Sequence, residues 1–185
     1  MAPAGWAAGA GVVFLRLSGW TYDNVLVVVV RGDRKEAQMD EPADDDVAAI
    51  NGLIARQFAS LRWKAGGAPA LDDFAADFLP GAMLFASARP VCAQSIGQFA
   101  ERMNGLVGTT LKSFNEEVIG IRVHVFGNIA VAIAACENTE NGTEVNRNVE
   151  MMLLVKDGGE WKIAAQAWDK ATDTRPIPAE LLASE

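Results

Sequence analysis

The chain has 185 residues, half of them hydrophobic, so it is long enough for one domain with a sizeable core. Its formal net charge of -8 argues against binding to nucleic acid or to an anionic membrane surface, because both favour basic patches. Two cysteines and one histidine exclude a disulfide scaffold and a zinc site with the usual ligands. We expect no metal or other cofactor, no membrane-spanning segment and a cytoplasmic location.

The first 40 residues differ in composition from the rest of the chain. Residues 1–38 carry a net charge of +1, which leaves -9 for the remainder. Two interpretations stay open: an N-terminal extension that is flexible or loosely docked, and an upstream read-through in which Met39 is the true start. Lys35 and Glu36 can be encoded by codons that resemble a bacterial ribosome-binding site, which favours the read-through interpretation. A peptide from residues 1–30, detected by mass spectrometry of the natively expressed protein, would exclude the read-through.

Three helices are predicted next. The first follows the acidic residues 44–46, which suit a helix N-terminus, and its apolar positions recur at helical spacing. These positions are Val47, Ile50, Ile54, Phe58 and Leu61. A second helix is predicted over 69–79 and a short strand over 82–88. The third helix begins at Ser95, where Ser95 and Gln98 form a capping-box pattern.

After residue 111 the hydrophobic period changes from helical spacing to alternation, which is typical of strands. Four strands are predicted near 118–126, 129–136, 144–156 and 160–171. They are joined by short turns, of which Asn141-Gly142 is the strongest hairpin signal. On the first of these strands, Val123 and Val125 are expected to face the core. Sequential antiparallel strands after helices indicate the α+β class. We expect a loosely ordered tail within residues 173–185.

Short phrases at residues 77–80, 83–85, 123–131 and 159–163, in this order of elements, resemble the SnoaL-like branch of the nuclear transport factor two-like superfamily. The resemblance covers roughly residues 45–171, within a predicted SnoaL-like domain of residues 41–172. It implies three N-terminal helices packed in the concave face of a strongly bent, mainly antiparallel sheet, which forms a cone with a cavity open at one end. Relatives include ketosteroid isomerase, polyketide cyclases and scytalone dehydratase, and homodimers formed through the outer sheet face are common among them.

An enzyme of this type needs a group that titrates near neutrality beside an apolar cavity. His124 is the only histidine. It shares a strand face with Arg122, so the alternative is a histidine at the surface or at a dimer interface. Strict alternation puts Asp169 on the face of Trp161 and Ile163, where an apolar surrounding would raise its pKa. The alternative for Asp169 is a solvated strand end. Both residues are candidate catalytic bases.

Apolar side chains on the helices and first strand are candidates for the wall of a ligand pocket. The candidates are the apolar residues Phe58, Trp63, Phe78, Phe85, Phe99 and Met103, together with one cation, Arg147. A stripe of apolar side chains at this spacing is more often plain core, which is the alternative for the apolar members. Arg147 and Glu150 lie three positions apart on one strand, hence on opposite faces, and which of them points inward stays open.

The expected function is therefore binding of a small apolar molecule within the cone. Proton-transfer chemistry on that molecule, such as isomerisation, cyclisation or dehydration, is the catalytic version of this hypothesis. The alternative is a non-catalytic ligand-binding or dimerisation module. The expected partners are a small apolar molecule and a second copy of the chain, with no nucleic acid and no membrane.

Overall fold

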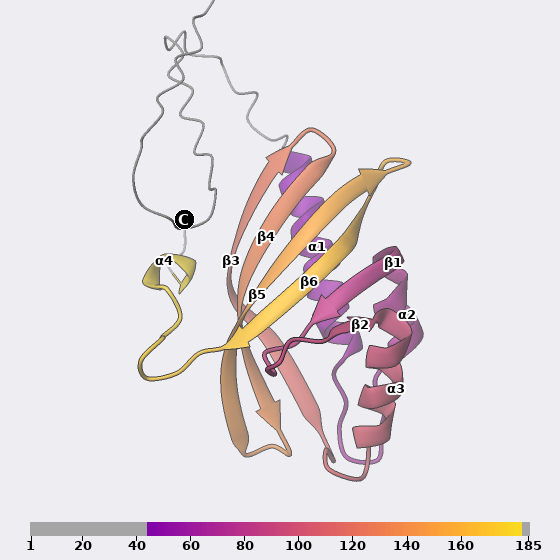
Figure 1. Cartoon of the computed structure of the whole chain (residues 1–185), viewed down its shortest axis with the longest axis vertical. Helices are drawn as coiled ribbons and strands as arrows, with labels where there is room; N and C mark the ends of the chain where they lie inside the picture. Colours follow the sequence, from indigo (N-terminus) through magenta and orange to yellow (C-terminus); the bar gives the residue numbers. More distant parts are fainter. Residues whose placement is uncertain (1–43, 183–185) are drawn as a thin grey trace, which may run out of the picture. The chain divides into compact units, whose positions relative to one another are not determined.

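The computed structural model of the chain describes residues 44–182 (Figure 1). Two helices come first, then two short strands and a third helix, then four long strands and a last short helix. The bounds are α1 Asp44–Ser60, α2 Leu71–Ala76, β1 Phe78–Phe85, β2 Ala93–Ser95, α3 Ile96–Leu106, β3 Phe114–Phe126, β4 Ile129–Glu140, β5 Glu144–Asp157, β6 Glu160–Lys170 and α4 Ala179–Leu182. The predictions for the N-terminal extension lie outside the described residues.

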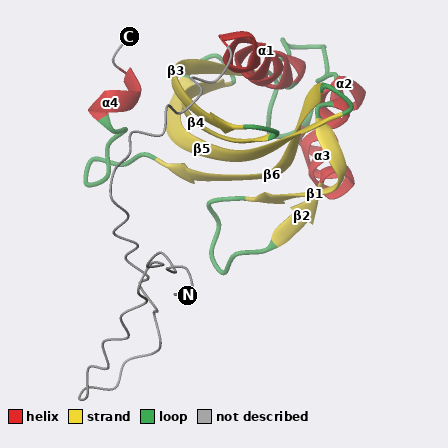
Figure 2. Ribbon diagram, turned by 90° about the horizontal axis from the view of Figure 1, so that it is seen from above, coloured by secondary structure: helices red, strands yellow, loops and turns green. Residues whose placement is uncertain are grey.

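The six strands form one sheet in the order β2-β1-β6-β5-β4-β3. Strands β3 to β6 make the predicted antiparallel meander, whereas β1 pairs with β6 in parallel and with β2 in antiparallel orientation. The sheet is strongly curved, and α1, α2 and α3 lie against its concave side (Figure 2). The predicted α+β class and the bent, mainly antiparallel sheet are confirmed.

Local sequence signals account for the main boundaries. Ser95 and Gln98 close a complete capping box at the start of α3, as predicted. Asn141 and Gly142 both take positive φ in the β4–β5 turn, which is the geometry that the Asn-Gly pair favours. The second helix is shorter than predicted and β1 begins at Phe78, because Pro80 disfavours helical geometry in the residue before it.

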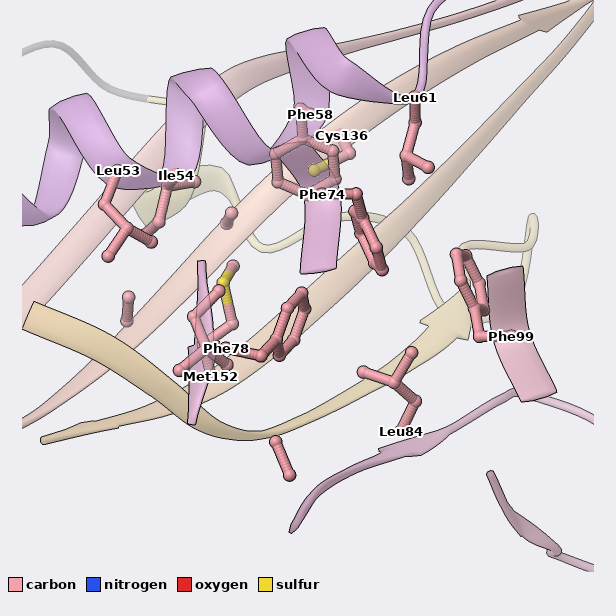
Figure 3. Close-up of a cluster of buried hydrophobic side chains, with 14 of the residues drawn as sticks. Leu53, Ile54, Phe58, Leu61, Phe74, Phe78, Leu84, Phe99, Cys136 and Met152 are labelled. Atoms are coloured by element: carbon pink, nitrogen blue, oxygen red, sulfur yellow. The ribbon is translucent and has the colours of Figure 1, made fainter. Parts of the chain in front are cut away.

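The core lies between the helices and the concave face of the sheet. Aromatic rings from α1, α2, β1 and α3 meet there, and Phe74 stacks on Phe99 with ring centroids 5.0 Å apart (Figure 3). β4 contributes small side chains to this core, and Ala132 and Ala134 are fully buried. Val123 and Val125 pack against this core, as predicted.

Two β-bulges change which residues face the core. On β3 the register shifts between Val118 and Gly120, and on β6 the extra residue is Ala164. A bulge adds one residue to one strand, so the alternation of faces reverses beyond it. Glu116 and Val118 therefore share the concave face with Ile121 and Val123, and Gln166 follows Ile163 on that face.

The C-terminal segment packs on the convex side of the sheet. It leaves β6 after Lys170, forms a backbone hydrogen bond from Ala171 N to Arg147 O of 2.8 Å, and ends in α4 beside β3 and β4. Leu181 in α4 is buried. The loose order expected within residues 173–185 stays a prediction, and residues 183–185 lie outside the described residues.

Candidate functional site

A cavity of about 370 Å³ opens between the helices and the concave face of the sheet. Its apolar wall comes from α1, α2, β1, α3 and the start of β3, with β6 adding Trp168. These side chains include Phe58, Leu61, Phe74, Leu84, Phe99, Met103, Leu106, Leu111, Phe114 and Trp168. A volume of this size is typical of sites for small organic ligands.

The sheet side of the cavity is polar instead. Strand register places Glu150 opposite Trp168 and Asn148 opposite Lys170, while Glu116 lies opposite Asn138. Glu116, Asn148, Glu150 and Gln166 are each at most 5 % exposed, and Gln57 of α1 is fully buried across from them. Buried carboxyl and amide groups are costly unless they are hydrogen-bonded, so this cluster, the polar floor, requires an explanation.

One hydrogen-bonded chain connects the polar floor. The side-chain amide of Asn148 donates to both carboxyl groups, at 2.8 Å to Glu150 Oε1 and 3.2 Å to Glu116 Oε1. Gln166 Nε2 donates a short hydrogen bond to Glu150 Oε2. Gln57 Nε2 donates to Gln166 Oε1 at 3.3 Å. Two carboxyl groups therefore share one donor inside a largely apolar cavity.

Burial shifts the protonation of both carboxyl groups. It raises the pKa of Glu116 to about 7, although hydrogen bonds from Asn148 and Asn138 and the charge of Arg62 act in the opposite direction. Burial, reinforced by the negative charge of Glu116, raises the pKa of Glu150 well above its usual value. Two like charges this close do not both form readily. Burial therefore favours the protonated form of both carboxyl groups, and the pair resists losing both of its protons.

Three amide oxygens in the cavity lining have no hydrogen-bond partner among residues 44–182. They are Gln57 Oε1, Asn138 Oδ1 and Asn148 Oδ1, and all three are buried. A buried acceptor that stays unpaired destabilises the fold. The polar floor is therefore short of donors, and an occupant of the cavity that carries a donor would complete it.

Cys136 lies beside the polar floor but does not supply a reactive thiol. Burial and the charges of Glu150 and Glu116 raise the pKa of the Cys136 thiol, so it stays protonated. Within residues 44–182, no three or more His, Cys, Asp or Glu side chains are grouped so as to hold a metal ion. None of the helices in that range combines the length and the hydropathy needed to cross a membrane.

No protein-family model matches the chain, and no curated protein matches it. Several solved structures match the chain. An NTF2-like protein of unknown function from Shewanella baltica aligns over 72 % of this chain and all of its own, with a TM-score of 0.53 and 12 % identity. A protein from Novosphingobium aromaticivorans that is named a putative scytalone dehydratase aligns over 69 % of this chain and 85 % of its own, with a TM-score of 0.57 and 13 % identity.

A ketosteroid isomerase-like protein from Erwinia carotovora aligns over 70 % of this chain and 98 % of its own, with a TM-score of 0.52 and 18 % identity. The chain has the NTF2-like fold. Identities this low establish the fold and leave the activity open. The predicted superfamily resemblance is confirmed at that level.

Neither predicted base lines the cavity of this NTF2-like cone. His124 is exposed and lies opposite Val131 on the convex face of the sheet. Asp169 is also on the convex face, opposite Val149, with its carboxylate 3.2 Å from Arg175 and 3.8 Å from Arg89. The prediction that Asp169 shares the face of Trp161 and Ile163 is wrong, because the bulge at Ala164 reverses the alternation. A catalytic role for either residue stays a prediction from sequence.

The apolar residues that were predicted to line the pocket divide into three groups. Phe58, Phe99 and Met103 line the cavity. Trp63 and Phe78 are buried in the core beside it, and Trp63 stacks on Phe114 with ring centroids 5.4 Å apart. Phe85 lines a separate, shallower hollow on the convex side.

Arg147 reaches the edge of the cavity, where it pairs with Glu137 at 2.8 Å. Of the pair left open by the sequence, Glu150 is the buried one. Glu116, Asn148 and Gln166 were not singled out from the sequence at all. The available signal was Asn148-x-Glu150, two polar residues at alternate positions leading into an apolar strand.

Proposed function

We propose that the cavity binds a small, largely apolar molecule and catalyses proton transfer on it, with Glu116 as the base and Glu150 as the acid. The supporting observation is that a single side-chain amide, that of Asn148, bridges these two buried carboxyl groups. We also propose, from the sequence phrases, that the chain is a member of the SnoaL-like branch. The proposed reaction is an isomerisation, a cyclisation or a dehydration.

The two roles follow from the different environments of the carboxyl groups. A general base works best when its pKa lies near the operating pH, and the pKa of Glu116 is raised to about 7. Glu150 is held by Gln166 and Asn148 deeper in the cavity and keeps its proton at that pH. A neutral carboxylic acid can donate a hydrogen bond to an oxygen that gains negative charge.

The chemistry balances without any further reactant. In an isomerisation, Glu116 removes a proton from a carbon next to a carbonyl group, while Glu150 donates a hydrogen bond to the carbonyl oxygen. The proton then returns to a different carbon. In a dehydration, Glu116 takes the proton from carbon, the C–H electron pair forms the double bond as the C–O bond breaks, and Glu150 gives its proton to the hydroxyl, which leaves as water. Transfer of the proton from Glu116 to Glu150 then restores the starting pair.

The elimination reaction of nitrobenzisoxazole tests the base without knowledge of the natural substrate. A base removes the ring C–H proton, the N–O bond breaks, and the electron pair ends on a coloured phenolate. We expect Glu116→Gln to lower kcat/KM by about 100-fold, the usual contribution of a positioned base. Glu150→Gln keeps a neutral group at its position, so it should retain most of the activity.

Glu117→Gln is the matched control, because Glu117 is the exposed neighbour of Glu116 on β3. It should leave the rate unchanged. The wild-type rate should rise with pH through about 7, since only the ionised form of Glu116 accepts the proton. A rate no greater than that of free acetate, or an equal rate in Glu116→Gln, would contradict the proposed base.

A homodimer formed through the convex face is also part of this proposal. Among the described residues, a group of exposed apolar side chains on β3, β4 and β5 includes Val131 and Leu153, each 45 % exposed, and Phe126, 81 % exposed. Ile129 and Met151 complete this set, the convex patch. Contiguous exposed apolar surface on a folded protein commonly marks an interface. Val131 and Leu153 lie opposite each other in the β4–β5 ladder, so the patch is continuous across strands.

A further inference from the structure

The lining of the cavity changes character from its interior to its mouth. The interior side chains are buried, and they form the apolar wall and the polar floor. The exposed lining residues include three cations, Arg102, Arg147 and Lys170. Outside the polar floor, Glu140 is the acidic side chain in the lining. In a chain with a net charge of -8, this is a local reversal of sign.

The mouth, the part of the cavity lined by exposed residues, lies where β6 ends and β5 continues without it. β6 ends at Lys170, opposite Asn148, whereas β5 continues back to Glu144. The first residues of β5, 144–147, therefore have no β6 neighbour, and here the cavity lining includes Asn146 and Arg147 of β5 and Arg102 of α3. Arg102 of α3 is held there, with its guanidinium carbon 5.0 Å from the centroid of the Phe99 ring. The cation thus rests on the apolar wall at the edge of the cavity.

Two of these cations have no carboxylate partner. Arg147 forms an ion pair with Glu137. Among residues 44–182, no carboxylate lies within ion-pair distance of Arg102 or Lys170. Partial burial lowers the pKa of the Arg102 guanidinium, yet arginine stays charged in proteins. An anionic group at the mouth would therefore meet two cations that are free to bind it.

The interior of the cavity requires hydrogen-bond donors from a ligand, whereas the mouth requires a negative charge. The unpartnered oxygens of Gln57, Asn138 and Asn148 accept hydrogen bonds, as does the ionised Glu116 carboxylate. Each gains a partner when a hydroxyl or N–H group enters, and an ether or ester oxygen satisfies none of them. Between the interior and the mouth, the wall consists of aromatic and aliphatic side chains.

Building on the proposed function of this cavity, we propose that its ligand is an anionic amphiphile with a ring-sized apolar body. A hydroxyl or other hydrogen-bond donor lies at the inner end, on the polar floor. A carboxylate or comparable anionic group lies at the mouth, between Arg102 and Lys170. The expected ligand class is thereby narrowed from any small apolar molecule to hydroxylated aromatic or alicyclic acids.

Four matched probes test both ends by isothermal titration calorimetry: para-hydroxycinnamate, its methyl ester, para-methoxycinnamate and cinnamate. The ester removes the anion, and the other two remove the donor. We expect para-hydroxycinnamate to bind about tenfold more tightly than its ester, as one good charge contact allows. Added salt should reduce this advantage, since exposed charges are screened. The methoxy compound and cinnamate should both bind more weakly than para-hydroxycinnamate.

A charge-matched pair of variants locates the anion. Arg102→Gln with Lys170→Gln should abolish the preference for the acid over the ester. Lys64→Gln with Lys112→Gln removes the same charge from exposed residues outside the cavity and should retain the preference. The probe comparison in the wild-type protein needs no variant to fold, so it decides the question independently.

Equal binding of acid and ester, or a preference that survives loss of both mouth cations, would overturn the anionic end of the proposal. Equal binding of the methoxy and hydroxyl probes would overturn the donor end. If no probe binds while the nitrobenzisoxazole reaction still requires Glu116, this inference fails and the proposed function stands. If that reaction is absent too, both fail.

Discussion

Gly120 and Leu181 are in direct backbone contact, because the carbonyl oxygen of Leu181 lies 1.8 Å from the place where a β-carbon on residue 120 would sit. Only glycine allows α4 to approach β3 so closely. Gly120→Ala should therefore displace α4 from the sheet and expose Leu181. We expect a loss of about 2 kcal/mol in the free energy of unfolding, the usual value of one buried leucine side chain.

Hydrogen exchange over residues 171–182 would measure this displacement directly. Gly52→Ala is the matched control, since a β-carbon there has nothing within 4 Å and α1 should be slightly stabilised. Unchanged protection of α4 in Gly120→Ala would contradict the proposed contact.

The polar floor should make stability depend on pH. The pKa of Glu116 is raised from 4.5 to about 7 in the folded state, so that state binds more protons than the unfolded chain between these values. The stabilising contribution is fully present below about pH 4.5 and is lost as the pH rises through about 7. The difference for Glu116 alone is roughly 3 kcal/mol.

Urea unfolding at about pH 5 and about pH 8 would show the higher stability at the lower pH. Glu116→Gln should flatten this dependence, because its side chain does not titrate. Glu117→Gln should keep it. A wild-type protein that becomes more stable from pH 5 to pH 8 would contradict the raised pKa.

Sequence alone predicted the features that depend on local chemistry. The capping box at Ser95, the turn at Asn141-Gly142 and the change of period after residue 111 all correspond to observed boundaries. The inward direction of Val123 and Val125 was predictable for the same reason, since no bulge interrupts the strand between them.

The polar floor depends on features that alternation does not encode. Counting back by twos from Val123 reaches Glu117, but the bulge on β3 brings Glu116 inward instead. Counting forward from Ile163 reaches Ala165, but the bulge at Ala164 brings Gln166 inward. On β5 both faces are apolar, because Met151 and Leu153 belong to the convex patch, so the pattern did not decide the direction of Glu150.

Asn148→Ala should weaken the pairing of the two carboxyl groups. Glu116 and Glu150 then lose their shared donor, at an expected loss of about 2 kcal/mol in the free energy of unfolding. The lost hydrogen bond favours the ionised carboxylate, so its removal raises the pKa of Glu116 further. The midpoint of the pH–rate profile for nitrobenzisoxazole should therefore move upward.

Asn146→Ala is the control, because Asn146 also lines the cavity but forms no side-chain hydrogen bond with another described residue. Its pH–rate midpoint should equal that of the wild-type protein. A midpoint that stays constant or falls in Asn148→Ala would show that the amide does not stabilise the ionised Glu116.

The convex patch should hold two copies of the chain together. Each copy has a mass of 19.7 kDa, so light scattering after gel filtration distinguishes monomer from dimer clearly. Leu153→Arg places a charge at the centre of the patch, opposite Val131, and a twofold interface meets that charge twice. We expect the variant to be a monomer with a native circular dichroism spectrum.

Val145→Arg is the control, because it changes a similarly exposed residue near the start of β5, outside the convex patch. It should leave the dimer intact. A wild-type protein that stays monomeric at high concentration would remove the patch from consideration as an interface between copies.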